Sequence, residues 1–166
     1  MTFSMQSVVR QSNPVDVIEL VATSREWSFE RSCEDEIAVS VRGLWTDYSV
    51  SLSWMEDCEA LHLACAFDLK IPEHRRVEAL RLVSMINEQL VIGHFDIWQD
   101  QGAVMFRHAL LLTGGLDPTS RQAERILALG LESCERFYQA FQFVVWGDRT
   151  AADGLKLSLF ETVGQA

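Results

Sequence analysis

The feature of this sequence that most restricts its fold is an alternation of apolar and polar side chains through four successive segments between residues 27 and 68. A side-chain repeat of two residues is typical of a β-strand with one buried face. Short polar turns separate the segments, so the pattern predicts consecutive antiparallel strands. The apolar members of the last two segments are Tyr48, Val50, Leu52 and Trp54, then Leu61, Leu63, Cys65 and Phe67. Small residues dominate the opposite face of the fourth strand, which suggests that another element packs closely there.

Other segments repeat their apolar residues at helical spacing. Asn13 and Pro14 begin the first of them, because asparagine caps helix N-termini and proline fits the first turn. Thr119 and Gln122 form a capping box at the start of the longest one. The predicted helices are 14–26, 73–91 and 119–146, and a last short segment, 150–160, also has helical character.

A second hairpin is predicted over residues 93–98 and 103–112, joined by a turn that contains Gly102. The resulting order is helix, four strands, helix, two strands and a long helix. This order lacks the strand–helix–strand alternation of parallel sheets, so the fold class is α+β, with an antiparallel sheet of about five to six strands and helices packed on it. Residues 13–166 form one domain without an internal linker, and the polar segment 1–12 is expected to be a mobile arm.

Charge and composition exclude several kinds of partner. The chain has 24 acidic and 14 basic residues, a net charge of −10, which repels nucleic acids and anionic membranes. It contains no apolar run long enough to cross a membrane and no leader at its start, so we expect a cytoplasmic protein. Cys33, Cys58, Cys65 and Cys134 form no closely spaced pair, and we expect free thiols and neither a metal nor a cofactor.

The sequence contains no familiar catalytic motif, but five polar residues on the last three predicted strands could form a site. His94 and Asp96 share one face of the fifth strand. His62 on the fourth strand, with Arg107 and His108 on the sixth, could join them if the registers agree. An imidazole, a carboxylate and a guanidinium would suit an anionic ligand or acid–base chemistry. The simpler explanation is a polar network in which these groups satisfy one another.

Two further clusters could form a surface for a partner. Arg75, Arg76 and Arg81 make the middle helix locally basic and could mark a docking surface for an acidic partner, although a solvated helix face would explain them equally well. The long helix carries five aromatic residues within ten positions, on more than one side. They are Phe137, Tyr138, Phe141, Phe143 and Trp146. Either both sides are buried within one subunit, or the outer side meets a second copy of the chain.

Several segments taken together resemble the YbjN-like family of bacterial proteins over roughly residues 27–165. The segments are Gly43–Tyr48, Phe67–Arg76, Ile86–Glu88, Gly93–Trp98, Phe106–His108 and Glu135–Gly147. The resemblance implies a fold like that of type III secretion chaperones, with a curved antiparallel sheet, and a regulator of sensory transduction with no established activity. Gln139, Asp148 and Val163 depart from the family's pattern, which puts a carried-over surface role for the C-terminal end in doubt.

Two hypotheses about function follow. The first is a non-enzymatic cytoplasmic module, homodimeric, that binds another protein through a sheet edge or apolar grooves. On this hypothesis the partner or dimer surface would include Phe137, Tyr138, Phe141, Trp146, Arg75 and Arg76, and Phe141→Asp would dissociate the dimer. The alternative is a small-ligand sensor or an unrecognised enzyme that uses a pocket of His62, His94, Asp96 and Arg107.

Overall fold

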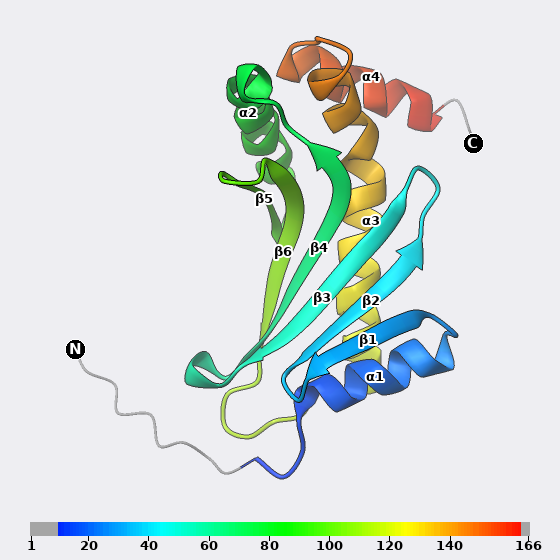
Figure 1. The fold of residues 1–166 in the computed structure, drawn as a ribbon, viewed down its shortest axis with the longest axis vertical. Helices are drawn as coiled ribbons and strands as arrows, with labels where there is room; N and C mark the ends of the chain where they lie inside the picture. The colour runs from blue at the N-terminus through cyan, green and yellow to red at the C-terminus, as the bar shows by residue number, and fades with distance from the viewer. Residues whose placement is uncertain (1–9, 164–166) are drawn as a thin grey trace, which may run out of the picture.

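The computed structural model describes residues 10–163, without the side chains of residues 161–163. Figure 1 shows an antiparallel sheet with a long helix behind it. The strands are β1 (Ser28–Cys33), β2 (Glu36–Arg42), β3 (Asp47–Met55), β4 (Ala60–Lys70), β5 (His94–Trp98) and β6 (Ala103–Leu111). The helices are α1 (Pro14–Ser24), α2 (Arg76–Asn87), α3 (Ser120–Val145) and α4 (Ala151–Val163), with short 3₁₀ turns at Glu56–Cys58 and Glu73–Arg75. The predicted α+β class is confirmed.

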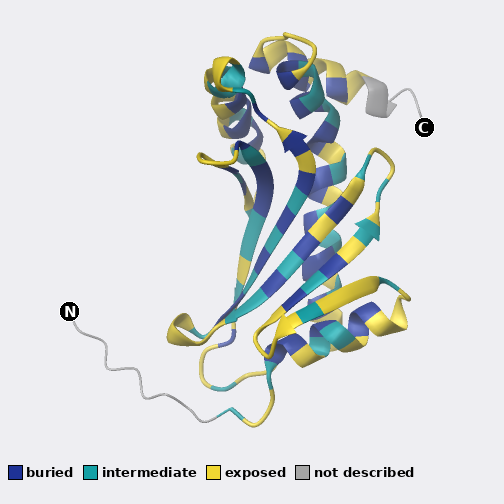
Figure 2. Cartoon of the chain, in the orientation of Figure 1, coloured by how far each residue is buried: buried dark blue, intermediate teal, exposed yellow. Residues whose placement is uncertain are grey.

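The six strands lie in the order β1-β2-β3-β4-β6-β5, and each pairs antiparallel with its neighbours. The sheet is open, so β1 and β5 are its edges. Pairing of Leu52 with Leu63 keeps the apolar rows of β3 and β4 on the same face, as the alternation predicted. Figure 2 shows the result as alternating buried and accessible positions along the central strands.

The long helix α3 covers the apolar face of the sheet. Its Thr119–Gln122 capping box is present, as predicted, with the threonine hydroxyl accepting from the Gln122 amide at 3.1 Å. Gly130 lies where α3 crosses β4, and a side-chain carbon added there would come within 3.1 Å of Leu63. The glycine therefore lets the helix lie close against the sheet.

An aromatic cluster joins α3 to four strands. Phe141 lies 5.7 Å from Phe67 of β4 and 5.5 Å from Phe95 of β5, measured between ring centroids. Phe137 and Tyr138 are also buried, beside Phe95 and Phe67 respectively. For these three rings, the first of the two alternatives holds: they are core residues of one subunit, so they are not accessible to a second copy.

Two features differ from the prediction. The helix expected over 73–91 is shorter, because Glu73–Arg75 forms a 3₁₀ turn and the Asn87 side chain turns to bond the backbone of β5. The close-packed element expected beside Ala64 is not found, since no helix among residues 10–163 packs on that face of the sheet.

Part of the predicted N-terminal arm is described. Arg10 donates to the carbonyl oxygens of Leu112 at 2.7 Å and of Leu116 at 2.6 Å, and its guanidinium lies 4.3 Å from the Trp54 ring centroid. Residues 1–9 lie outside the described residues. No helix in the described part of the chain is long and apolar enough to cross a membrane.

Phe141→Ala should lower the free energy of unfolding by about 3–5 kcal/mol, because it removes a fully buried ring that contacts both β4 and β5. Urea denaturation followed by circular dichroism measures the change. Phe143→Ala, two residues away on the more accessible side of α3, is the matched control and should cost much less. Equal losses for the two variants would contradict the assignment of Phe141 to the core. Phe141→Asp should accordingly unfold the chain rather than separate two folded subunits.

Candidate functional site

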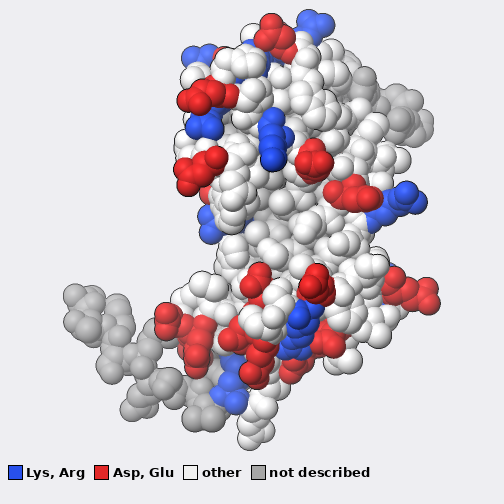
Figure 3. Space-filling model, in the orientation of Figure 1, with Lys and Arg blue, Asp and Glu red and all other residues white. Residues whose placement is uncertain are grey.

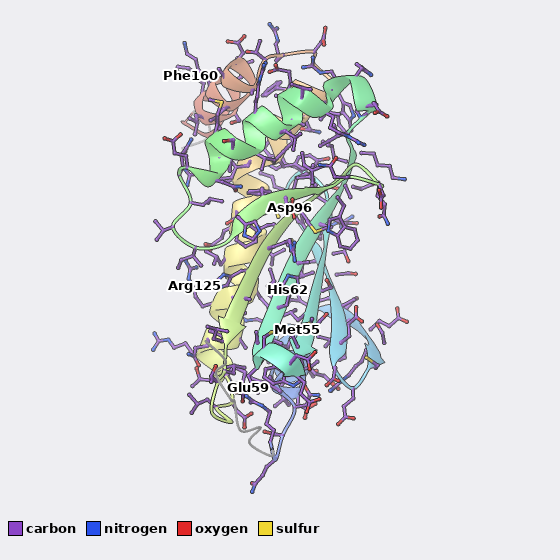
Figure 4. All side chains as sticks on the ribbon, turned by 90° about the vertical axis from the view of Figure 1, so that its left-hand side faces the viewer. Met55, Glu59, His62, Asp96, Arg125 and Phe160 are labelled. Atoms are coloured by element: carbon purple, nitrogen blue, oxygen red, sulfur yellow. The ribbon has the colours of Figure 1, made fainter. Side chains whose placement is uncertain are left out.

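Three of the predicted site residues converge on the sheet face that points away from α3. Arg107 of β6 pairs with His94 of β5 on one side and with Ala64 of β4 on the other, so these side chains share a face. Its Nε donates to His62 Nε2 at 3.3 Å, and its Nη1 lies 3.2 Å from Asp96 Oδ2. Figure 4 shows His62 and Asp96 on this side of the sheet. The strand pairing therefore brings these polar side chains to one face of the sheet, a point that the sequence alone left open.

A cavity of about 340 Å³ lies at the end of β5, where β6 continues beyond its partner strand. Its lining includes three of the chain's four histidines, which come from three different strands. The lining residues are His62, Gly93, His94, Arg107, His108 and Ala109. Asp96 is outside this lining and reaches it only through Arg107. Among the described residues, no group of histidine, cysteine and carboxylate side chains could hold a metal ion.

Burial and neighbouring positive charge lower the pKa of two of these imidazoles. The pKa of His62 is lowered mainly by burial, with contributions from Arg107 and His94. The pKa of His108 is lowered by burial and then by His94. Since His62 Nε2 accepts from Arg107, its Nδ1 carries the proton and can donate to a ligand. The site therefore presents a fixed guanidinium and, beside it, imidazole N–H groups that can donate hydrogen bonds.

The basic residues of the middle helix serve the fold. Arg75 donates through Nε to the Val144 carbonyl at 2.8 Å and through Nη2 to the Arg149 carbonyl, and it pairs with Asp148 at 2.9 Å. Arg76 donates to the carbonyl of Gln99 at 2.8 Å. Both arginines thus bind parts of their own chain, and they hold α2 against the α3–α4 junction and the β5–β6 turn. Of the predicted partner residues, Trp146 is well exposed, at 62%.

Sequence reasoning missed the role of Asn87 at the β5 edge. Its Nδ2 donates to the Phe95 carbonyl at 3.0 Å, and its Oδ1 accepts the Phe95 amide at 2.7 Å. The side chain therefore occupies the hydrogen-bonding positions that a seventh strand would use. The segment Ile86–Glu88 stood out only as part of the family resemblance, and no local pattern revealed this contact.

The sequence indicated the uncovered sheet face only through the small residues of the fourth strand, which we expected another element to cover. Rows of small side chains cross it from β2 to β4, in register with the His–Arg cluster. One row runs Ala38, Ser51, Ala64 and Arg107, and the next runs Ser40, Ser49, Ala66 and Met105. In Figure 3 the charged side chains gather toward the two ends of the molecule, and the middle of this face is largely free of charge. We call these residues of β2, β3 and β4 the small-residue face.

The architecture and the site together define a small α+β domain with an open antiparallel sheet, one covered face and one uncovered face. The chain belongs to the YbjN family, whose profile, described as "Putative bacterial sensory transduction regulator", matches residues 14–143. This match confirms the resemblance drawn from the sequence motifs.

Two solved structures are similar to the chain. One is the crystal structure of YbjN, "a putative transcription regulator from E. coli", with a TM-score of 0.54 at 11% identity over 80% of this chain and 90% of that chain. This similarity concerns the fold alone. The other is a chain of the ExsC–ExsE complex, with a TM-score of 0.48 at 20% identity over 76% of this chain and 94% of that chain. No curated protein matches the sequence.

The lowered histidine pKa values predict a pH-dependent stability. Because His62 and His108 bind protons more weakly in the folded chain, the unfolded chain takes up more protons below the ordinary pKa of 6.5. The free energy of unfolding should therefore fall as the pH drops from 7.5 to 5.5. Urea denaturation at several pH values measures this loss. His62→Gln should reduce it, and His74→Gln, outside the cavity, should not; the same slope in all three proteins would contradict this cause.

Proposed function

We propose that the chain is a non-enzymatic protein-binding module whose partner covers the small-residue face. The observation that carries the proposal is this face itself, a sheet surface of small neutral side chains that no described helix covers. The family description as a regulator supports a binding role over a catalytic one. Free cysteines and a net charge of −10 support a cytoplasmic module with a protein, rather than a nucleic acid, as its partner.

The physical argument for this face is the low cost of covering it. Burying serine and alanine side chains removes little charge from water, whereas burying unpaired ionic groups is costly. The alternating strands place Ser49 and Ser51 of β3 outward together with Ala64 of β4. Small side chains also allow a partner's backbone to approach the sheet closely. On the face that Figure 3 shows, the charges lie mainly toward the two ends, where they can select a partner without being buried.

The edges of the sheet are a weaker alternative for an extended partner. At β5, Asn87 already bonds the amide and carbonyl of Phe95 that face outward. At β1, Arg31 pairs with Asp16 at 2.7 Å and with Glu19 at 2.6 Å, which ties this edge strand to α1. These features favour binding across the face over addition of a strand at the β5 edge.

Charge placed on the small-residue face should weaken partner binding. The partner is first identified by native mass spectrometry of the protein purified gently from its host, and its affinity is then measured by calorimetry. Ser49→Glu and Ser51→Glu should each weaken binding about tenfold or more, since a partly desolvated carboxylate costs at least about 1.4 kcal/mol. Ser120→Glu, in the first turn of α3, is the matched control and should bind normally. Unchanged affinity for both face variants, with folding intact, would reject this face.

We also propose that the module is a homodimer. Five exposed large apolar side chains fall in the segment from α2 to the end of β5, namely Val77, Leu80, Val91, Ile92 and Trp98. The exposed fraction of Trp98 is 49%, comparable with that of Trp146 at the α3–α4 junction. Apolar side chains of this size are enriched in interface cores, so the segment is the favoured contact and Trp146 the second candidate.

Native mass spectrometry and light scattering should give twice the monomer mass of 18.8 kDa. Trp98→Ser should shift the protein to the monomer, because it removes a large apolar contact. Trp146→Ser, which deletes another exposed indole elsewhere, is the matched control and should remain dimeric. A monomeric wild-type protein would reject the dimer, and loss of the dimer in Trp146→Ser alone would move the interface to the α3–α4 junction.

A further inference from the structure

We propose that the cavity between β4, β5 and β6 binds a small ligand through an oxyanion group, a phosphate or a carboxylate. This site is separate from the protein-binding role proposed above, although the register places it beside the small-residue face. The cavity volume of about 340 Å³ is near the lower end of the range for small-molecule sites, roughly 300–1,000 Å³, so the ligand is small.

Histidine and arginine side chains gather in the lining of the cavity. In a chain with a net charge of −10, three of the four histidines and a guanidinium gather around one cavity. They come from residues 62, 94, 107 and 108, so chain neighbours alone do not explain the grouping. Asp96 is the acidic side chain paired with this cluster, and it lies outside the lining. Imidazole and guanidinium N–H groups are donors that suit phosphate and carboxylate oxygens.

Two side-chain contacts hold the guanidinium of Arg107 in a fixed orientation. Its Nε faces His62 and its Nη1 faces Asp96, so two contacts from different strands fix the plane of the guanidinium. Among the described residues, none accepts a hydrogen bond from its Nη2, so the N–H groups of Nη2 can donate to a ligand. The side chain of Arg107 is 37% exposed and that of Asp96 is 44% exposed, so solvent screens this ion pair. Asp96 therefore orients the arginine without closing the site.

Binding at this site also involves the protonation of its histidines. His62 on β4 and His108 on β6 have lowered pKa values, caused first by burial and then by nearby His94, with Arg107 contributing at His62. Within the described part of the chain, the acidic group paired with the cluster is Asp96 on β5, which is engaged with Arg107. A bound anion favours the protonated form of His108, whereas His62 keeps the Nε2 lone pair that accepts from Arg107. Ligand binding is therefore coupled to proton uptake and becomes tighter as the pH falls toward 6.

Histidine NMR tests the site with inorganic phosphate as the probe, at constant ionic strength set by sodium chloride. Phosphate should shift the imidazole resonances of His62, His94 and His108 in a saturable manner at pH 6.0, and acetate, which is ionised at both pH values, should bind at least threefold more tightly at pH 6.0 than at pH 7.5. His74, on the turn before α2, is an internal reference and should not follow the same curve. Equal, unsaturated shifts of all four histidines, or no shift up to 50 mM phosphate, would overturn the proposal.

Two variants separate this site from general charge effects. Arg107→Gln should weaken phosphate binding at least tenfold, while Arg42→Gln, which removes an exposed arginine at the end of β2, should leave it unchanged. His94→Gln, at an exposed position on the edge strand, should also weaken phosphate binding. This second variant tests the site if Arg107→Gln disturbs folding. Normal binding in folded Arg107→Gln or in His94→Gln would overturn the assignment. Acetate titrated in the same way distinguishes a carboxylate site from a phosphate site.

Discussion

The packing of the α3 aromatic rings against one face of the sheet is the interaction on which the rest of this structure depends. Phe141 touches rings on β4 and β5, two strands that are separated in the sheet by β6. It thereby holds the second hairpin in place beside the first four strands. Edge-to-face contacts such as that between Phe95 and Phe137 add orientation to the burial of apolar area. Removal of this ring would leave a cavity between the two hairpin systems, which would then be joined by the pairing of β4 with β6 and by the remaining core residues.

One-sided packing determines where polar chemistry can occur. The apolar rows of the strands pack against α3. Because side chains alternate along each strand, Ser51, His62 and Arg107 lie on the opposite face. A slip of one residue between β4 and β6 would bury the guanidinium and expose Phe106, so core packing protects the register of the polar cluster. The small-residue face and the cavity are therefore consequences of the same core, and they lie in continuous register.

Much of the fold follows from local sequence patterns. The strand alternation, the Asn13 cap and the capping box at Thr119 each depend on residues close in the chain, and the structure contains all three. The convergence of His62 with Arg107 depends on the pairing of β4 with β6 across 45 positions, which no local pattern specifies. The backbone contacts of Arg75 could not be predicted for the same reason, since the two carbonyls that it binds lie about 70 residues away. Aromatic composition likewise could not tell a core ring such as Phe137 from an exposed one such as Trp146.

The hydrogen bonds of Arg75 have a consequence for how this chain can change in evolution. Two of its contacts go to main-chain carbonyls, at Val144 and Arg149, on either side of the α3–α4 junction. These two bonds do not depend on the side chain of Trp146, whereas Asp148, also between the two carbonyls, pairs with Arg75 through its carboxylate. Trp146, within this stretch, can therefore be exchanged without loosening α2 from the junction. The structure thus separates a position that can diversify among descendants of this chain from the contacts that keep its helices together.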